Sequence, residues 1–376
     1  MQTVIPATLR VGTTPAALVL QAIRLGAPIA RDTLAGETGL SPATINRQVT
    51  ALGELGFVVE RRDLGHAGGI GRPKHPLVLD RDKLCVAGMH IGARRTLLVI
   101  ADLGGRTLYS HAVRTPRDDP HTSSAALCRQ LRELADRFAG RRLLWGGVAL
   151  GGRVDAATGV VDHPVLGWRN VPVGRQLADA LGVPVSVCEH VQAMAAAELL
   201  LSSPRSDEDS GLFFYARETT GMAVTVDGRV LVPGRGAGTI AHTRVDAPIL
   251  CGGGATLQDV IGVDVARRAA QRLGVSPDAS VIADERARIL GEVVAVFRDA
   301  VNPDSVVVAG DAFAAHPQGL APVQAAFDAA SKVGWPLELT ASRFGVSVQE
   351  SAAIVVALSV IYSEPVIAMT YCRARA

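Results

Sequence analysis

Aromatic residues are scarce in this chain of 376 residues, since phenylalanine, tyrosine and tryptophan together make up 4% of it. Aliphatic side chains must therefore build the core, and a hydrophobic content of 48% is typical of a well-buried globular protein. The length exceeds what one ordinary core accommodates, which predicts two or three packed units.

Cysteine is also scarce. The five cysteines are odd in number and no two of them form a CxxC pair, which argues against a disulfide framework and favours the reducing cytoplasm. No charged leader with an apolar stretch stands at the N-terminus, so we expect no signal peptide. No apolar run reaches the length of a membrane span, and Val355–Val360 is predicted to be a buried helix segment, so we expect no contact with a membrane.

A strong net charge is missing as well. The formal net charge is +2, and the first 80 residues carry eight basic and six acidic side chains. Binding to nucleic acid cannot be inferred from such totals, so any basic surface must be local.

The first 80 residues nevertheless contain the element order of a winged helix-turn-helix domain. Thr14 is a plausible N-cap for the first helix, Gly39 permits a tight left-handed turn, and Ser41 is a plausible N-cap for the third helix. A glycine-rich, basic loop, Arg61–Lys74, separates two short strands. The predicted elements are helices at Pro15–Leu25, Asp32–Thr38 and Ser41–Gly53, and strands at Phe57–Glu60 and Pro76–Leu79.

The third helix has one apolar and one polar side. Ile45, Val49 and Leu52 fall at helical spacing and should face the core. The opposite side carries short polar groups and one arginine, which suits entry into a major groove, and the basic loop suits phosphate contact or the minor groove. The candidate DNA-contacting residues are Ser41, Ala43, Thr44, Asn46, Arg47, Thr50, Arg61, Arg62, Arg72 and Lys74. The alternative is a helical module that binds another protein through its arginine-bearing face.

After Asp80 the pattern changes to strands that alternate with helices, in two similar halves. The first half predicts strands at Val86–Ile91, Leu97–Ala101, Thr107–Val113, Leu143–Leu150 and Val185–Cys188, with helices near Ala125–Phe138, Val173–Leu181 and Val191–Leu201. The second half predicts strands at Leu212–Ala216, Met222–Val226, Arg229–Val232 and Val306–Ala309, with helices near Asp264–Leu273 and Ala287–Val301. A polar segment, Ser202–Ser210, is the candidate connection between the halves.

Nearly the whole chain resembles the ROK family (repressors, open reading frames and kinases). The head is similar to the repressor branch in TLAGETGLSPATINRQVTALGELGFV and GGIGRPKHPLVLD, and the body in GWRNVPVGRQLADALGVPVSV and AMAAAELLL. The resemblance implies an α/β (α+β) chain in which a winged helix-turn-helix precedes two RNase-H-like, actin-like lobes of the sugar-kinase type. We expect these domains at residues 1–80, 81–202 and 203–376, with the C-terminal helix a candidate to pack back on the first lobe.

The chain departs from the family's kinases where phosphate and substrate are handled. Their first phosphate loop reads DxGGT, whereas residues 90–94 read HIGAR and begin with His90. Their Asn-Asp pair, which supplies the general base, aligns here with Glu189 and His190, and Glu198 anchors that alignment. The possible second phosphate loop, residues 218–221, has one glycine and places a carboxylate where it would repel phosphate. These losses predict no catalysis and no bound ATP.

The sugar and zinc motifs are degraded too. The sugar-binding ExGH segment reads TIAH at residues 239–242, and Val165 replaces an asparagine of the family. The zinc loop CxCGxxGCxE reads ILCGGGATLQ at residues 249–258, so Cys251 alone remains of three cysteines, and we expect no metal and no cofactor. The candidate residues of an altered ligand cleft are Val165, Glu189, His190, Gln192, Thr239 and His242.

Three functions follow from these patterns and from what the resemblance implies. The first is a DNA-binding transcriptional regulator, a repressor or dual regulator, that binds a palindromic operator as a homodimer or tetramer and senses a sugar or a sugar derivative. The second is a sugar kinase with a fused DNA-binding head. The third is a regulator without a ligand, in which the body serves only for dimerisation.

Overall fold

The computed structural model describes residues 3–64, 75–202, 210–233 and 238–373. It divides into two compact units, one formed by Met1–Pro204 with Gln349–Ala376 and the other by Arg205–Val348. The first unit contains a small N-terminal head and a first lobe, and the second unit is a second lobe.

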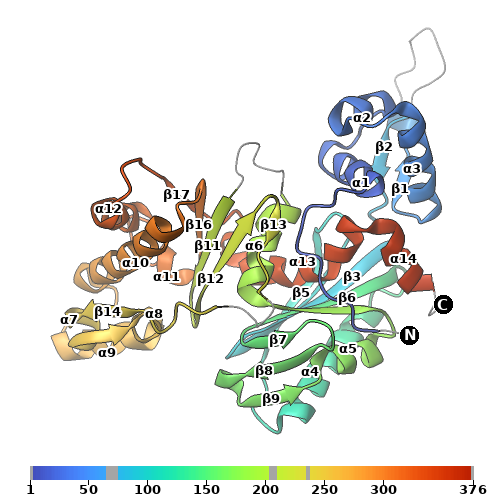
Figure 1. Cartoon of the computed structure of the whole chain (residues 1–376). Coiled ribbons are helices and arrows are strands. Elements are labelled where there is room, and N and C mark those ends of the chain that lie inside the picture. The colour runs from blue at the N-terminus through green and yellow to red at the C-terminus, as the bar shows by residue number, and fades with distance from the viewer. Residues whose placement is uncertain (1–2, 65–74, 203–209, 234–237, 374–376) are drawn as a thin grey trace. The chain divides into compact units, whose positions relative to one another are not determined.

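The head is built from three helices and a strand pair, and its helices begin where the sequence predicts. Thr14 Oγ1 accepts a hydrogen bond from Ala17 N, and Ser41 Oγ accepts one from Thr44 N, both at 3.3 Å. Gly39 adopts φ 66° between the second and third helices. The elements are α1 (Pro15–Gly26), α2 (Arg31–Thr38), α3 (Pro42–Glu54), β1 (Val58–Glu60), the 3-10 turn η1 (Arg62–Leu64) and β2 (Leu77–Leu79) (Figure 1).

One apolar core holds the head together. Strands β1 and β2 pair antiparallel, with Val58 opposite Leu79, and Ile29 makes a β-bridge to Leu77 just before α2. The side chains that fill the centre come from all three helices and from the turn before β1, and each is at most 1% exposed: Ile23, Leu34, Ile45, Leu52 and Phe57. The helix-turn-helix with a strand hairpin is therefore a folded module with its own interior.

The first lobe is a five-stranded sheet with helices. Its strand order is β10-β6-β3-β4-β5, in which β3, β4 and β5 form an antiparallel meander and β6 and β10 add parallel to β3. Its elements are β3 (Leu84–Ile91), β4 (Arg95–Ala101), β5 (Thr107–Arg114), α4 (Pro120–Asp136), β6 (Arg142–Leu150), β7 (Arg153–Asp155), β8 (Val160–His163), η2 (Pro164–Leu166), β9 (Trp168–Val171), α5 (Val173–Leu181), β10 (Val185–Glu189), α6 (His190–Leu200), α13 (Val348–Ser363) and α14 (Pro365–Arg373).

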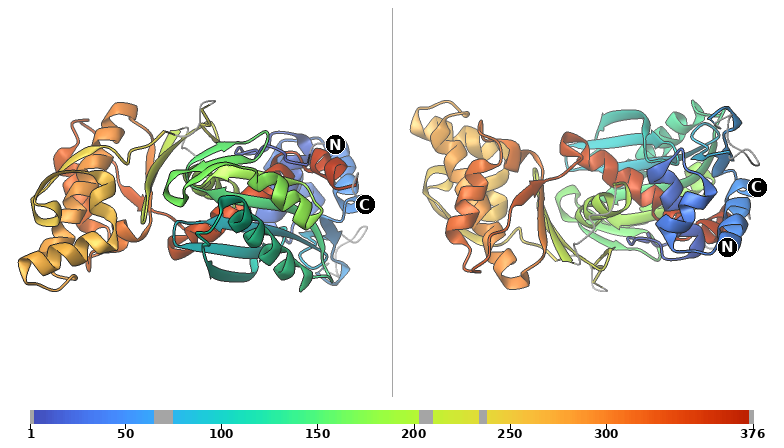
Figure 2. Two further views of the ribbon diagram at one scale, coloured as in Figure 1. Left: turned by 90° about the horizontal axis from the view of Figure 1, so that it is seen from below. Right: turned by 90° about the horizontal axis from the view of Figure 1, so that it is seen from above.

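Helix α13 packs against the sheet at two glycines. A Cβ atom on Gly88 would lie 2.9 Å from the carbonyl of Ala353, and one on Gly147 would lie 2.4 Å from the backbone nitrogen of Ala357. Only glycine at these two positions lets the backbone of α13 come so close to the strands. Figure 2 shows α13, in red, among the elements of the first unit.

The N-terminal strap, which we define as residues Thr3–Gly12, links the sheet of the first lobe to the head. Ile5 N donates to the carbonyl of Val185 at 2.8 Å, so the strap adds a short parallel bridge at the start of β10. Further along, Gly12 lies so close to α13 that a Cβ atom there would be 2.9 Å from the Cα of Ser363. The strap therefore contacts β10 first and α13 next, before the chain enters α1.

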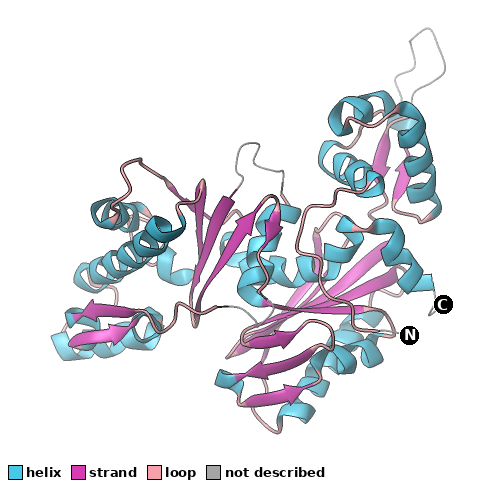
Figure 3. Ribbon diagram, viewed as in Figure 1, coloured by secondary structure: helices cyan, strands magenta, loops and turns pink. Residues whose placement is uncertain are grey.

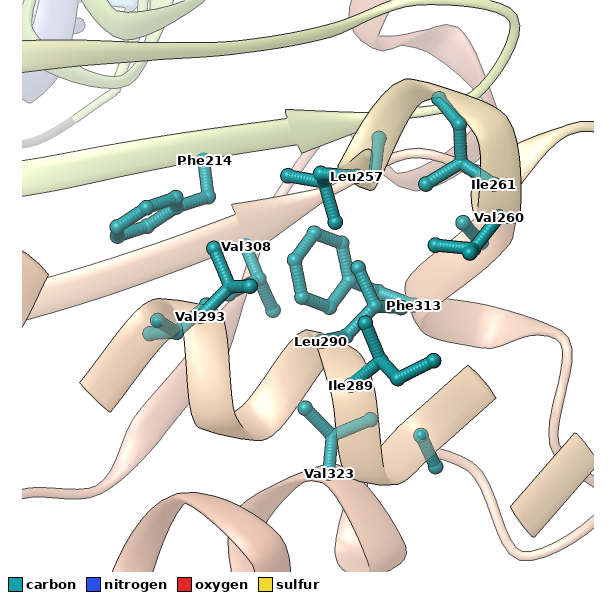
Figure 4. Packing of buried hydrophobic residues seen from close by; sticks show 14 of the residues in the cluster. Phe214, Leu257, Val260, Ile261, Ile289, Leu290, Val293, Val308, Phe313 and Val323 are labelled. Atoms are coloured by element: carbon teal, nitrogen blue, oxygen red, sulfur yellow. The ribbon is translucent and has the colours of Figure 1, made fainter. Parts of the chain in front are cut away.

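The second lobe repeats the strand order of the first. In β13-β12-β11-β16-β17 the first three strands are antiparallel and the last two are parallel to β11 (Figure 3). Its elements are β11 (Ser210–Ala216), β12 (Thr220–Val226), β13 (Arg229–Val230), β14 (Arg244–Ala247), α7 (Pro248–Cys251), β15 (Gly253–Thr256), α8 (Leu257–Ile261), α9 (Val263–Leu273), α10 (Ser280–Val301), β16 (Ser305–Ala309), α11 (Asp311–Ala314), α12 (Ala321–Ala330), β17 (Leu339–Ala341) and η3 (Gly345–Ser347). Phe214, Val308 and Leu290 lie together in its hydrophobic core (Figure 4).

Several expectations need correction. The second lobe, expected at residues 203–376 with the C-terminal helix a candidate to pack back on the first lobe, ends at Val348 in this division. Residues Gln349–Ala376 belong to the first unit, because the apolar helix α13 packs on the first sheet as that candidate requires. This helix is longer than the predicted Val355–Val360. With η3, Gly345–Ser363 is long and apolar enough by composition to cross a membrane, but most of it is buried, as in a core helix. The small sheet β7-β8-β9 was not predicted, and most of the expected connection Ser202–Ser210 lies outside the described residues.

Candidate functional site

The outer side of α3 exposes the predicted DNA-contacting residues. Ile45, Val49 and Leu52 are at most 3% exposed and face the head core. The exposed residues on the other side are Ala43, Asn46, Arg47 and Thr50, with Thr44 half-buried beside them. The helix is therefore amphipathic in the predicted orientation, with its arginine and amide at the surface.

Arg31 adds a basic group that sequence reasoning missed. Its Nη1 donates to Asn46 Oδ1 at 2.9 Å, and its Nη2 pairs with Glu60 Oε1 at 2.5 Å. The guanidinium therefore lies between the outer side of α3 and the end of β1. No pattern near residue 31 indicates this position, because it depends on how α2 packs against α3.

The remaining predicted residues of the head differ in their surroundings. Ser41 is exposed, but its hydroxyl caps α3 and also lies 3.0 Å from Thr44 Oγ1. Arg61 forms a two-point ion pair with Asp63, at 2.7 and 2.5 Å, and these hydrogen bonds lower the pKa of the Asp63 carboxyl. Arg62 is exposed in η1. Arg72 and Lys74 lie outside the described residues.

A second polar group lies in the first lobe, where β3 ends and α6 begins. His90 Nε2 is 3.3 Å from His190 Nδ1, and the two rings stack with centroids 5.5 Å apart. His190 Nε2 is 3.4 Å from Glu189 Oε1. We assign the tautomers so that His90 Nε2–H donates to His190 and His190 Nε2–H points to the carboxylate, which gives both nitrogens of His190 a partner. In this tautomer the lone pair of His190 Nδ1 accepts a hydrogen bond from His90.

Parallel strand pairing brings these residues together. Strands β3, β6 and β10 are parallel neighbours, so their carboxyl ends meet at one edge of the sheet. His90 lies near the end of β3, and Glu189 ends β10. Glu189 Oε2 also accepts a hydrogen bond from Gln192 N at 2.9 Å and thereby caps α6. The carboxylate that aligns with a residue of the kinase base pair thus serves as a helix cap.

His163 is a third buried histidine at this edge, and sequence reasoning missed it. It is 4% exposed at the end of β8, and its ring lies edge-on to Trp168 at 6.5 Å. A Cβ atom on Gly151 would lie 3.5 Å from His163 Nε2 and 3.6 Å from His190 Nε2, so both rings border the same glycine. We call His90, His163 and His190 the histidine cluster.

Burial controls protonation in this cluster. Desolvation lowers the pKa of His163 to about 4, assisted by repulsion from His190, and lowers the pKa of His190 to about 4. Desolvation raises the pKa of Glu189 to about 7, against the hydrogen bonds from the start of α6. At neutral pH His163 and His190 are therefore neutral, and the site lacks the fixed negative charge that two aspartates would supply.

The other predicted cleft residues do not share one environment. Gln192 is buried in the first turn of α6, whereas Val165 is 53% exposed in η2. Thr239 and His242 belong to the second unit and are exposed there, before β14. Thr239 Oγ1 accepts a hydrogen bond from Ala241 N at 3.1 Å, which is a local turn contact.

The two stretches that match phosphate loops are occupied by internal contacts. Gly92 N donates to the carbonyl of Arg95 at 3.1 Å, so the first stretch is a closed turn between β3 and β4. In the second lobe, the Gln258 side chain accepts from Thr220 N at 3.2 Å and donates to the carbonyl of Glu218 at 2.8 Å. A side-chain amide therefore engages backbone that a phosphate would need.

The stretch that matches the zinc loop is held by other groups. Buried Glu285 accepts from Ile249 N at 2.9 Å and from Leu250 N at 2.6 Å, which caps the short helix α7. Thr256 and Asp259 form a capping box at the start of α8. Cys251 is exposed, and desolvation and nearby Asp259 raise the pKa of its thiol. Within the described ranges, no group of three His, Cys, Asp or Glu side chains is placed to hold a metal ion.

Comparison with known proteins agrees with this architecture. The ROK family model matches residues 86–332. Transcriptional regulator Rv0485 of Mycobacterium tuberculosis is 43% identical, over 96% of this chain and 89% of that protein. A solved ROK family transcriptional regulator, described as a homolog of the Escherichia coli MLC protein, superposes with a TM-score of 0.75 at 21% identity, over 96% of this chain and 99% of that one.

A kinase also shares the body. The ROK family glucokinase of Streptomyces griseus, solved with glucose and AMPPNP, has a TM-score of 0.60 at 19% identity, over 73% of this chain and 99% of that one. This likeness shows the actin-like kinase fold, while the two regulators match the head as well as the body. The chain belongs to the ROK family.

Proposed function

We propose that this chain is a DNA-binding transcriptional regulator that binds duplex DNA through the outer side of α3, and that its kinase-like body does not transfer phosphate. The observation that carries the proposal is the orientation of α3. Its apolar residues are buried in the head, whereas Asn46, Arg47 and Thr50 are exposed. Relatives that span almost the whole chain are named transcriptional regulators.

The exposed groups have the chemistry that reads base edges. Arginine donates two hydrogen bonds to guanine, and asparagine pairs with adenine, while threonine contacts either bases or phosphates. Arg31 holds the Asn46 side chain at 2.9 Å, which orients the amide before any DNA arrives. Ala43, with its single methyl group, leaves room for a base edge at the start of the helix.

Selection from a random-sequence duplex pool tests the DNA-binding function. The wild-type chain should enrich a palindromic sequence and bind it more tightly than a scrambled duplex, with an affinity that falls steeply as salt rises. Equal affinity for the selected and the scrambled duplex would refute the proposal. Equal affinity is the result expected if the head is instead a helical module that binds another protein.

The absence of catalysis rests on the groups that occupy the kinase positions. Phosphoryl transfer needs a metal, a phosphate cradle and a group that accepts the hydroxyl proton. Here His190 is engaged by His90 and Glu189, and the matching loops make internal contacts. An assay of ADP formation with hexoses and amino sugars should give no turnover above a protein-free blank. Turnover that His190→Ala abolishes would instead favour the sugar kinase.

We further propose that the regulator works in the cytoplasm as a homo-oligomer, without zinc or ATP, and that it senses a sugar derivative. Two heads are needed to bind the two halves of a palindrome, and a ligand acts by shifting the population of states that hold the heads at the right spacing. Sedimentation should give a dimer or tetramer. A thermal-shift screen with sugars, sugar phosphates and polyols should find a stabilising ligand, whereas a uniform lack of shift would favour the ligand-independent regulator.

A further inference from the structure

Helix α6 extends from the histidine cluster to the head. The proposed function gives this helix no role. It has 11 residues, which correspond to about 16 Å of helix at 1.5 Å per residue. It begins at His190, directly after its cap Glu189, and ends at Leu200. Nine of its residues are buried, so the helix is fixed by packing along nearly its whole length.

The far end of α6 is held by an arginine of the head. Arg24, in the last turn of α1, donates from Nη2 to the carbonyl of Leu200 at 2.6 Å and from Nη1 to that of Leu201 at 3.4 Å. The last carbonyls of a helix have no partner within the helix, and a cation there is favourable. The guanidinium also lies 4.7 Å from the ring centroid of Tyr362, on α13. Arg24 therefore joins α1, α6 and α13 at one point.

The N-terminal strap makes a second connection to the same site. It pairs with Val185 at the start of β10, and Ser186 Oγ donates to the carbonyl of Ile5 at 2.8 Å. Strand β10 ends at Glu189, where α6 begins. The Glu189–His190 corner is thus linked to the head by two routes, one along α6 to Arg24 of α1 and one along β10 to the strap that precedes α1.

We propose that α6 is a rigid connector through which the histidine cluster controls the DNA-binding head, and that Arg24 is the residue that couples the two. The inference rests on the proposed DNA-binding function and adds its route of regulation. Allosteric coupling requires that the two sites bias one common element. Helix α6 contacts both sites, since its first turn carries His190 and the carbonyls at its end accept hydrogen bonds from the head.

A double-mutant cycle tests the coupling without knowledge of the natural effector. His190→Ala removes the contacts with His90 and Glu189 at one end of α6, and Arg24→Ala removes the contacts at the other end. The readout is the Kd for a duplex selected by the wild-type chain from a random pool. Changes at sites this far apart are ordinarily additive within about twofold, whereas coupled sites deviate by roughly threefold or more. We expect the deviation to be threefold or greater.

A matched control separates the connector from general destabilisation. Arg132 also donates to the carbonyl at the end of a helix, Leu181 of α5, at 3.2 Å, but it lies on α4 of the first lobe and takes part in none of the head contacts described above. The effects of Arg132→Ala and His190→Ala on the Kd for the selected duplex should be additive. Arg24→Lys, which keeps the positive charge but loses the two-point contact, replaces Arg24→Ala if thermal unfolding shows that the alanine variant is not folded.

Each outcome decides the inference. Additivity of His190→Ala with both Arg24 variants would overturn it, and so would equal deviations with Arg24→Ala and Arg132→Ala. Failure of the wild-type chain to prefer any selected duplex would overturn the proposed function itself. Selective binding by the wild type together with an additive Arg24 cycle would leave the proposed function standing and refute only the connector.

Discussion

Helices α3 and α6 place their polar residues in opposite ways. Helix α3 buries an apolar stripe of Ile45, Val49 and Leu52 and exposes Asn46 and Arg47. Helix α6 is buried almost all round, and two of its polar residues, His190 and Gln192, lie inside the protein. One helix therefore offers hydrogen-bonding groups to a partner, whereas the other uses them within the fold.

The difference shows where the chain keeps its capacity for recognition. A buried polar group must be paired within the protein, and a paired group costs free energy to release. His190 and Glu189 have such partners in the fold, while the Arg47 side chain is exposed. The helix with the exposed side is the one that can gain interactions without first breaking others.

The largest expected difference comes from one substitution made on both helices. Ala196→Leu on α6 adds three carbon atoms at a site that is 0% exposed and should reduce the free energy of unfolding by about 1–3 kcal/mol. Ala43→Leu on the exposed side of α3 should change it by no more than about 0.5 kcal/mol but weaken binding of the selected duplex. Denaturant unfolding and duplex titration measure the two effects. Equal losses of stability would contradict the contrast.

A smaller effect is expected from pH. His163 and His190 each have a pKa of about 4 in the folded protein, against an ordinary value of 6.5, so the unfolded chain binds more protons between these values and their contribution to stability falls as pH falls. The pKa of Glu189 is raised to about 7, so its contribution to stability increases as pH falls. This one group opposes the two histidines, His163 and His190. Acidification from pH 6.5 to 4.5 should therefore destabilise the wild type relative to a variant with His163→Gln and His190→Gln.

Thermal unfolding of both proteins at each pH measures this difference. The difference in Tm, wild type minus variant, should decrease steadily over that range. A difference in Tm that does not change with pH would show that the two histidines titrate alike in the folded and unfolded chains.

The smallest effect is expected from a chelator. The stretch Ile249–Gln258 is held by Glu285 and by the capping box of α8, so EDTA should leave the Tm unchanged. Glu285→Ala, in contrast, leaves the buried N–H of Leu250 and the partly buried N–H of Ile249 without their acceptor and should cost about 1–3 kcal/mol. A Tm lowered by EDTA, with zinc bound in stoichiometric amount, would refute the proposal that the loop needs no metal.

The sequence predicted the head better than the site in the first lobe. Helix periodicity and caps predicted the face of α3, because a helix face depends on neighbours three and four residues away. His163 and Arg31 were missed, because their contacts depend on an unpredicted hairpin at β8 and on the packing of α2 against α3. His90 and His190 are 100 positions apart, and only parallel pairing of β3, β6 and β10 brings them together.

The proposed function requires that the outer side of α3 reads DNA sequence. The most direct test measures the Kd of the wild type and of Arg47→Ala for the selected duplex and for a scrambled one, with Arg153→Ala, an exposed arginine of β7, as the control. Arg47→Ala should lower the preference for the selected duplex roughly tenfold or more, while Arg153→Ala should preserve it. An unchanged preference in the Arg47→Ala variant would refute sequence reading by this side of α3.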